Sequence, residues 1–229
     1  MKGKRLAVLF LVCLLALCCC GCKSAEEKSA AQARANWNQA DNQEKMDVYT
    51  ALIKEYMLLT EDLGKNTPYP AMKRSVKGSM ITSGLTQEEA ISLAEEYLIR
   101  EEAVFWQAKE DGIVPTDEEV KVYVRENVIE EVAQEENYDL VSEACEKEGI
   151  TFEDTIWAYE NSYKVDLIGE KAGITNYEDM ADYQDEAVKA YKNSDAYKAY
   201  EDVLHHCAQL VRDNVTDKET LKAAEIYYE

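Results

Sequence analysis

The chain has 229 residues, of which 46 are acidic and 25 are basic, and its net charge at neutral pH is −21. Such a surface repels the phosphates of nucleic acids and anionic lipid headgroups, so binding to DNA or RNA is not expected. Apolar residues make up 46% of the sequence, which excludes a chain that is disordered throughout. A folded domain of about 190 residues is long enough to bury about 70% of its unfolded surface.

The first 22 residues differ sharply from the rest of the chain. Three basic residues precede an uncharged, mostly apolar run from Leu6 to Cys20, and Gly21 and Cys22 follow. A basic start, a short apolar centre and a small-residue cleavage region are the parts of a secretory signal peptide. The run is shorter than the roughly 20 apolar residues of a membrane-spanning helix, so an uncleaved anchor is the less favoured interpretation.

With a cysteine directly after Gly21, this segment resembles a bacterial lipoprotein signal, in which that cysteine is diacylated. The resemblance implies a signal peptide over residues 1–21 and lipid attachment at Cys22, with Cys20 as the alternative. Two acyl chains hold a protein stably in a bilayer, whereas one holds it only marginally. We therefore expect the protein on the extracytoplasmic face of the cell membrane. Loss of the signal would remove three positive charges and lower the net charge from −21 to −24.

Residues 22–42 are expected to form the lipidated cysteine and a flexible tether. This segment is rich in Ala, Ser, Gln, Asn and Glu, its only large apolar residue is Trp37, and its end is compatible with a helix. A helical domain is then expected over residues 43–229. Its first helix is predicted from apolar residues that recur at steps of three and four between Met46 and Leu63.

Residues 65–84 break the helical pattern and form the one locally basic stretch of this acidic chain. Two interpretations remain open. The segment is either a solvated loop between helices or a partner-facing arm. In the second case Tyr69, Met72, Met80 and Ile81 would supply the apolar contacts to a client. The stretch contains no acid, and its basic residues are Lys65, Lys73, Arg74 and Lys77.

Further along the chain, the signals for helix ends are unusually clear. A threonine with an acid three positions later is typical of a capping box, and a Gly-Ile pair is typical of a helix C-terminus. We predict helix starts at Thr86, Thr116 and Thr151, a shorter helix over Tyr138–Glu148, and stops at Gly112-Ile113, Gly149-Ile150 and Gly173-Ile174.

The C-terminal part after Thr175 is predicted to be helical, with breaks near Asn193–Asp195 and near Asn214–Thr216. No run of alternating or β-branched residues is long enough to predict a sheet. The predicted fold class is therefore all-α.

A resemblance to a known family is carried by the segment Leu98–Val120. Its Ala-Lys-Glu-Asp-Gly-Ile end, which leads into Thr-Asp-Glu-Glu-Val, resembles the N-terminal helical domain of the SurA/PrsA-type extracytoplasmic chaperones. Gly149–Asp154 is similar to the start of the next helix in that family. Val76–Thr82 is weakly similar to the segment that precedes the helices, with Lys77 in place of the family's asparagine. The resemblance spans residues 76–172.

This resemblance implies a SurA N-domain-like multi-helix core, followed by long C-terminal helices, that cradles unfolded or newly exported polypeptides. Members of the family commonly carry a parvulin peptidyl-prolyl isomerase domain of α/β type. The sequence offers no strand-forming region to build one, so isomerase activity is not expected. The alternative function is that of a structural or adaptor lipoprotein bound to one specific surface partner.

We expect no catalytic residues, no metal and no cofactor. His205 and His206 are adjacent on a predicted helix, so their side chains point about 100° apart and cannot easily share a metal ion. The sequence has no zinc-protease, nucleophile-elbow, Walker or dinucleotide-binding motif. Cys145 and Cys207 are the two cysteines beyond the signal. They could pair, but two small buried apolar residues are the favoured interpretation.

Overall fold

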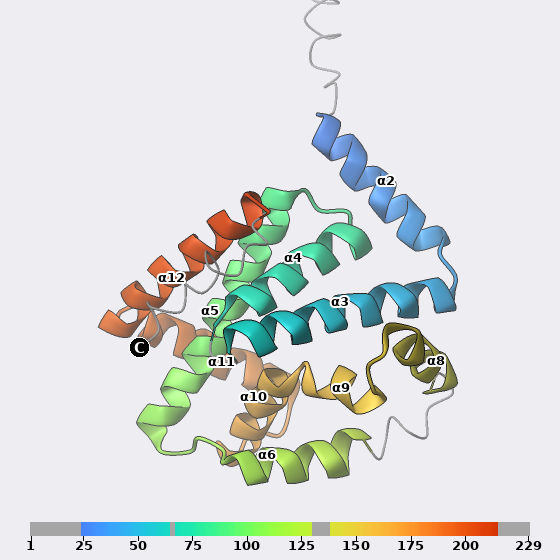
Figure 1. Cartoon of the computed structure of the whole chain (residues 1–229). Coiled ribbons are helices and arrows are strands. Elements are labelled where there is room, and N and C mark those ends of the chain that lie inside the picture. The colour runs from blue at the N-terminus through green and yellow to red at the C-terminus, as the bar shows by residue number, and fades with distance from the viewer. Residues whose placement is uncertain (1–23, 65–66, 130–137, 215–229) are drawn as a thin grey trace, which may run out of the picture.

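The structure is a computed structural model, and it describes residues 24–64, 67–129 and 138–214. Every regular element in these ranges is helical, which confirms the predicted all-α fold class (Figure 1). None of the described helices is both long and apolar enough to cross a membrane. The predicted signal peptide, Cys20 and the lipidation site Cys22 lie outside the described residues.

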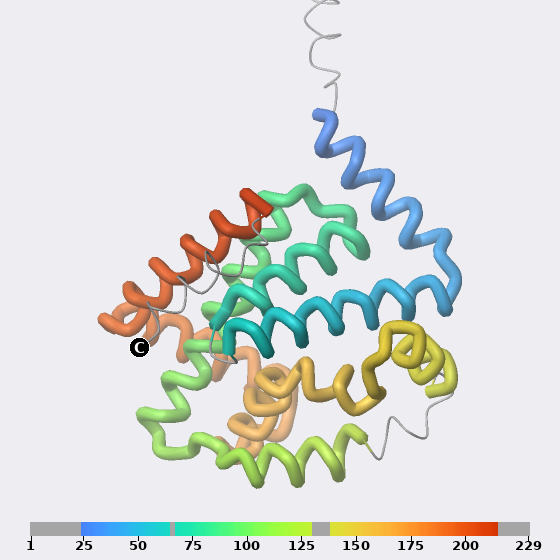
Figure 2. Tube along the Cα trace, viewed as in Figure 1, coloured from blue at the N-terminus to red at the C-terminus, as the bar shows by residue number. Residues whose placement is uncertain are grey.

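The helices follow one another with short connections, and the trace folds back repeatedly around α3, α4 and α5 (Figures 1 and 2). In chain order the elements are α2 (Ala25–Gln39), α3 (Asn42–Leu63), α4 (Tyr69–Thr82), α5 (Gln87–Asp111), α6 (Asp117–Val124), the π-helical turn η1 (Arg125–Ile129), α8 (Tyr138–Glu148), α9 (Phe152–Trp157), α10 (Glu160–Lys171), α11 (Tyr177–Tyr191) and α12 (Asp195–Arg212).

The segment that was expected to be a flexible tether contains a regular helix. In α2, Ser24 and Glu27 form a capping box at the N-terminus, and the helix packs against α4. Gly84 allows a close approach to α2: a Cβ at this position would lie 2.5 Å from the carbonyl oxygen of Ala30. The expectation of an irregular segment is corrected for residues 25–39, because alanine, glutamate and glutamine are good helix formers as well as solvent-compatible residues.

The basic stretch is a central helix, neither a loop nor an exposed arm. Pro68 and Pro70 stand at the N-cap and the second position of α4. A missing backbone N–H is not costly at these positions, because the first N–H groups of a helix have no partner within it. The two prolines therefore begin a helix.

Most of the core lies between α4, α5, α11 and α12. Its largest fully buried side chains include Tyr69, Met72, Ile91, Tyr191 and Leu204. A second, smaller cluster is formed by α6, α9 and α10, and a third joins α5 to α10. The third cluster thus connects the large cluster, which includes α5, to the smaller one, which includes α10.

The predicted helix ends are confirmed at the level of individual hydrogen bonds. Thr86, Thr116 and Thr151 each form the expected capping box. The three glycines that precede isoleucine have positive φ angles, and each isoleucine N–H donates to the carbonyl five residues earlier. The break before α12 is also confirmed, with Ser194 as its N-cap.

One predicted helix is split in two. The chain was expected to be helical from Thr151 to Ala172, but Tyr159 has a φ of −112° and separates α9 from α10. Cys145 and Cys207 are both buried and both are free thiols, as the favoured interpretation predicted.

Candidate functional site

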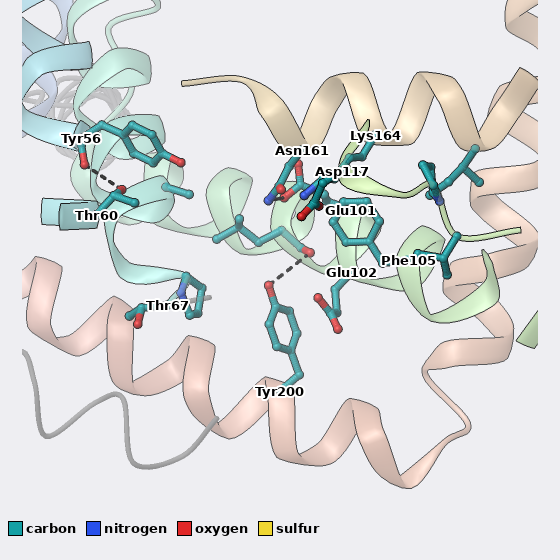
Figure 3. Close-up of a pocket in the computed structure, with 16 residues that line it drawn as sticks. Tyr56, Thr60, Thr67, Glu101, Glu102, Phe105, Asp117, Asn161, Lys164 and Tyr200 are labelled. Carbon is teal, nitrogen blue, oxygen red and sulfur yellow. Dashed lines mark hydrogen bonds between the residues drawn. The ribbon is translucent and has the colours of Figure 1, made fainter. Parts of the chain in front are cut away.

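A cleft opens where α3, α5, α6 and α10 meet, at the junction of the large and small apolar clusters. It consists of two adjoining cavities of about 340 Å³ and about 790 Å³. Figure 3 shows the smaller one. The two are adjacent because five residues line both: Tyr56, Thr60, Asp117, Asn161 and Lys164.

Local sequence signals position these side chains. Tyr56 and Thr60 lie one turn apart at the end of α3, where the Thr60 hydroxyl donates to the Tyr56 carbonyl at 2.8 Å. Asp117 is the first residue of α6, directly after the capping threonine. Asn161 and Lys164 lie three residues apart in the first turns of α10, so they share one helix face. The break at Tyr159 sets the direction of that face.

Apolar side chains form part of the walls. Met57 and Trp157 line the larger cavity and Phe105 the smaller one, and all three are half-buried. Below them Val120 is 1% exposed and belongs to the small core. A ligand that covers these half-exposed side chains would remove apolar surface from water, which favours binding. Methionine and aromatic rings also tolerate ligands of varied shape.

The charge of the cleft is negative. Among the residues that the structure describes, six carboxylate residues and two lysines line the two cavities. One lysine, Lys164, is paired with Glu160 at 2.7 Å. The cleft therefore favours ligands that carry positive charge and disfavours anions. The acids are Glu61, Glu101, Glu102, Asp117, Asp154 and Glu160, and the second lysine is Lys121.

The Glu101 carboxylate, which lines the smaller cavity, accepts two side-chain hydrogen bonds. Asn161 donates to one of its carboxylate oxygens at 3.1 Å and the Tyr97 hydroxyl donates to the other at 3.3 Å. Burial raises the pKa of Glu101 above its usual value, although both hydrogen bonds act in the opposite direction. The Tyr97 hydroxyl also contacts that of Ser162 at 3.1 Å. These contacts tie α5 to α10, although Tyr97 and Ser162 themselves are not among the lining residues of the two cavities.

Within the described ranges, no group of three or more His, Cys, Asp or Glu side chains is arranged so that it could hold a metal ion. His205 and His206 are exposed on α12 and line neither cavity.

The four residues predicted to bind clients do not line the cleft. Tyr69 and Met72 are 0% exposed in the main core. Met80 packs against that core and Ile81 is half-buried on α4. In this conformation a client cannot contact Tyr69 or Met72, because α4, which carries them, lies in the centre of the bundle. Pro68 and Ala71, from the same stretch, do line the smaller cavity.

Sequence reasoning did not find the cleft residues. Tyr56 and Met57 belong to the predicted apolar stripe of α3, but nothing in that pattern connects them to Trp157, which lies about a hundred residues later. Comparisons of the chain with protein-family models, curated proteins and solved structures found no match. The cleft is therefore interpreted from its own geometry.

Proposed function

We propose that the protein is a lipid-anchored, extracytoplasmic binding protein with chaperone-like activity, which holds segments of unfolded or newly exported polypeptides in the cleft between α3, α6 and α10. The observation that carries the proposal is the combination of half-exposed apolar side chains, such as Met57 and Trp157, with a surplus of carboxylates. This combination suits an extended segment in which apolar and basic side chains alternate. The lipoprotein-like N-terminus and the SurA/PrsA-like signature support the location and the class of ligand.

The expected mode of binding is non-covalent and weak. The apolar walls are already partly buried, so a ligand gains only part of the roughly 1.5–3 kcal/mol that full burial of a large apolar side chain provides. An unfolded segment must also lose conformational freedom when it binds. Weak binding suits a protein that must release its clients without an energy source.

Short synthetic peptides test the proposal. The full chain in lipid nanodiscs should bind a peptide of alternating leucine and lysine, and bind peptides of alternating leucine and glutamate or serine and lysine much more weakly. Hydrogen exchange should show protection in α3, α6 and α10 with the first peptide. Equal affinity for the leucine–glutamate peptide would contradict the charge argument, and protection elsewhere would contradict the location.

Variants of the cleft sharpen the test. Asp117→Asn should weaken binding of the leucine–lysine peptide about two- to fivefold, the value of one exposed charge pair. Met57→Ala should weaken both leucine peptides. The matched control is Glu186→Gln, which removes an exposed acid on α11 away from the cleft. If the control weakens binding as much as Asp117→Asn, only the net charge of the protein matters and the cleft is not the site.

Chaperone-like activity and adaptor function give different results in two further assays. A chaperone-like protein slows the aggregation of an unfolding client at near-stoichiometric amounts. An adaptor yields one crosslinked surface partner and has no affinity for the peptides.

The anchor is tested by mass spectrometry of protein purified from membranes. We expect an N-terminal peptide that begins at Cys22 and carries a diacylglyceryl group, and we expect Cys22→Ala to abolish it. If Cys20→Ala loses the lipid and Cys22→Ala keeps it, Cys20 is the lipidated residue.

A further inference from the structure

A further cavity of about 480 Å³ lies between α2, α3, α4, α5 and the junction of α9 and α10, and it shares Ala71 with the smaller cavity of the cleft. Figure 1 shows how α2 and α3 meet beside α4 at this end of the molecule. Lys45 and Arg74 line the cavity, and none of the described residues that line it is acidic. This composition is unusual for a chain with 46 acidic residues.

The two cations also differ from the other partly or fully buried cations in the described ranges. The other five each form an ion pair with a carboxylate: Lys54, Lys73, Lys77, Arg100 and Lys164. Neither Lys45 nor Arg74 has a carboxylate partner within 4.0 Å among the residues that the structure describes. The cavity is thus lined by two cations that form no ion pair with a described carboxylate.

Arg74 is held in one orientation. Its guanidinium lies 4.2 Å from the ring centroid of Tyr56 and 4.3 Å from that of Tyr159, and it donates to the Ala158 carbonyl at 2.6 Å. Glu101 is near enough for the charge of Arg74 to favour its ionised form, but the two form no ion pair. A guanidinium that is already ordered loses little freedom when it binds a carboxylate, and its planar shape allows two parallel hydrogen bonds.

The remainder of the cavity wall is largely apolar and aromatic. Met46, Leu52 and Ile53 of α3 and Ala71 of α4 line the cavity, and the Trp37 ring centroid lies 5.8 Å from the Lys45 ammonium nitrogen. The volume is within the range of small-molecule sites, about 300–1,000 Å³. A ligand that fits such a wall has an apolar body and one anionic end.

We propose that this cavity binds a carboxylate amphiphile of the fatty-acid class. The carboxylate is bound by Arg74, with Lys45 contributing further positive charge, and the alkyl chain lies against α3 and α4. The site is distinct from the acidic cleft, which disfavours anions, and the proposal does not depend on the function proposed for that cleft.

The test uses the full chain in nanodiscs of zwitterionic lipid and a dodecanoate probe with a diazirine near its methyl end. After illumination, mass spectrometry should locate the crosslinks in α2, α3 and α4. The matching diazirine-bearing dodecanol should label these segments about 10- to 100-fold less, the value of hydrogen bonds to a charged group. Arg74→Gln should reduce labelling by dodecanoate by the same factor, and Arg125→Gln, an exposed arginine on η1, should not change it.

Further variants make each outcome decisive. Circular dichroism checks that Arg74→Gln is folded. If it is not, Lys45→Gln is used as the test variant, and labelling by dodecanoate is expected to decrease about two- to fivefold. Asp117→Asn in the cleft should leave labelling unchanged. Equal labelling by the alcohol, retention of labelling in a folded Arg74→Gln protein, or crosslinks spread over the whole chain would overturn the proposal. So would stronger competition by an apolar peptide with a free C-terminal carboxylate than by unlabelled dodecanoate.

Discussion

Replacement of Glu55 by glutamine tests how the basic stretch of this acidic chain is neutralised. Lys73 and Lys77 of α4 reach the Glu55 carboxylate at 3.1 and 2.6 Å. The side chain of Lys73 is only 9% exposed, whereas that of Glu55 is 34% exposed. Burial opposes ionisation of Glu55, but the hydrogen bonds from Lys77 and Lys73 outweigh it and lower the pKa of Glu55 below its usual 4.5.

The expected cost follows from the burial of Lys73. Removal of one partner from a fully buried ion pair costs about 3–5 kcal/mol, because the other charge is left without compensation. Water reaches Glu55, so we expect a smaller loss of about 2–3 kcal/mol for Glu55→Gln. The control is Glu148→Gln, because Glu148 is 31% exposed and its partner Lys54 is 41% exposed. Because the lysine of this pair is far more exposed than Lys73, we expect a loss of at most about 1 kcal/mol.

Urea unfolding followed by far-ultraviolet circular dichroism measures both costs. In thermal unfolding, the loss for Glu55→Gln corresponds to a decrease in Tm of about 4–12 °C for a domain of this size. Because the pKa of Glu55 is lower in the folded state, its contribution is present above pH 4.5 and is lost as the pH falls through the folded-state pKa. The unmodified protein and the Glu55→Gln variant should therefore become equally stable at low pH. The reasoning is refuted if Glu55→Gln costs no more than Glu148→Gln at neutral pH, or if the difference persists in acid.

Three further predictions concern local structure. Gly84→Ala should destabilise the protein by about 1–3 kcal/mol more than Gly112→Ala, and it should accelerate amide exchange in α2. Both glycines have a positive φ, but of the two only Gly84 would place the new methyl group against another helix. Equal effects would show that α2 is not held at this contact. Cys145 and Cys207 should resist alkylation in the native state and react fully in urea, because both are buried and burial raises the pKa of Cys207 to about 12; a mass two units lower before reduction would instead reveal a disulfide. Thr151→Ala should cost about 1 kcal/mol in urea unfolding through loss of the N-cap, and no loss would mean that the cap is not formed in solution.

The features that the sequence predicted correctly depend on neighbours only a few residues apart. The capping box of Thr116 involves a side chain three residues away, and the stop at Gly112 involves a hydrogen bond across five residues. Such signals act through the backbone of one segment, so tertiary structure does not need to be known. The fold class follows from the same local patterns together with the absence of strand-like runs.

The features that the sequence did not predict depend on contacts between distant segments. The lysines of α4 suggested an exposed basic patch, because their partner Glu55 lies on another helix and 46 acids offer too many candidates. Tyr69 and Met72 are buried because α4 lies in the centre of the bundle. The prolines at the start of α4 did not indicate a helix in the sequence. The break at Tyr159 has no proline or glycine to mark it, yet it directs Asn161 and Lys164 into the cleft.

The two sites that we propose have opposite charge but share one wall. Tyr56 lines the acidic cleft, Arg74 lines the cationic cavity, and the guanidinium of Arg74 stacks on the ring of Tyr56. Loss of Arg74 therefore changes both sites, since Tyr56 loses its packing partner in the same variant. Asp117 lines only the cleft and Lys45 only the cavity. Variants of these two residues separate the sites, whereas an effect of Arg74→Gln on peptide binding measures how strongly the shared wall couples them.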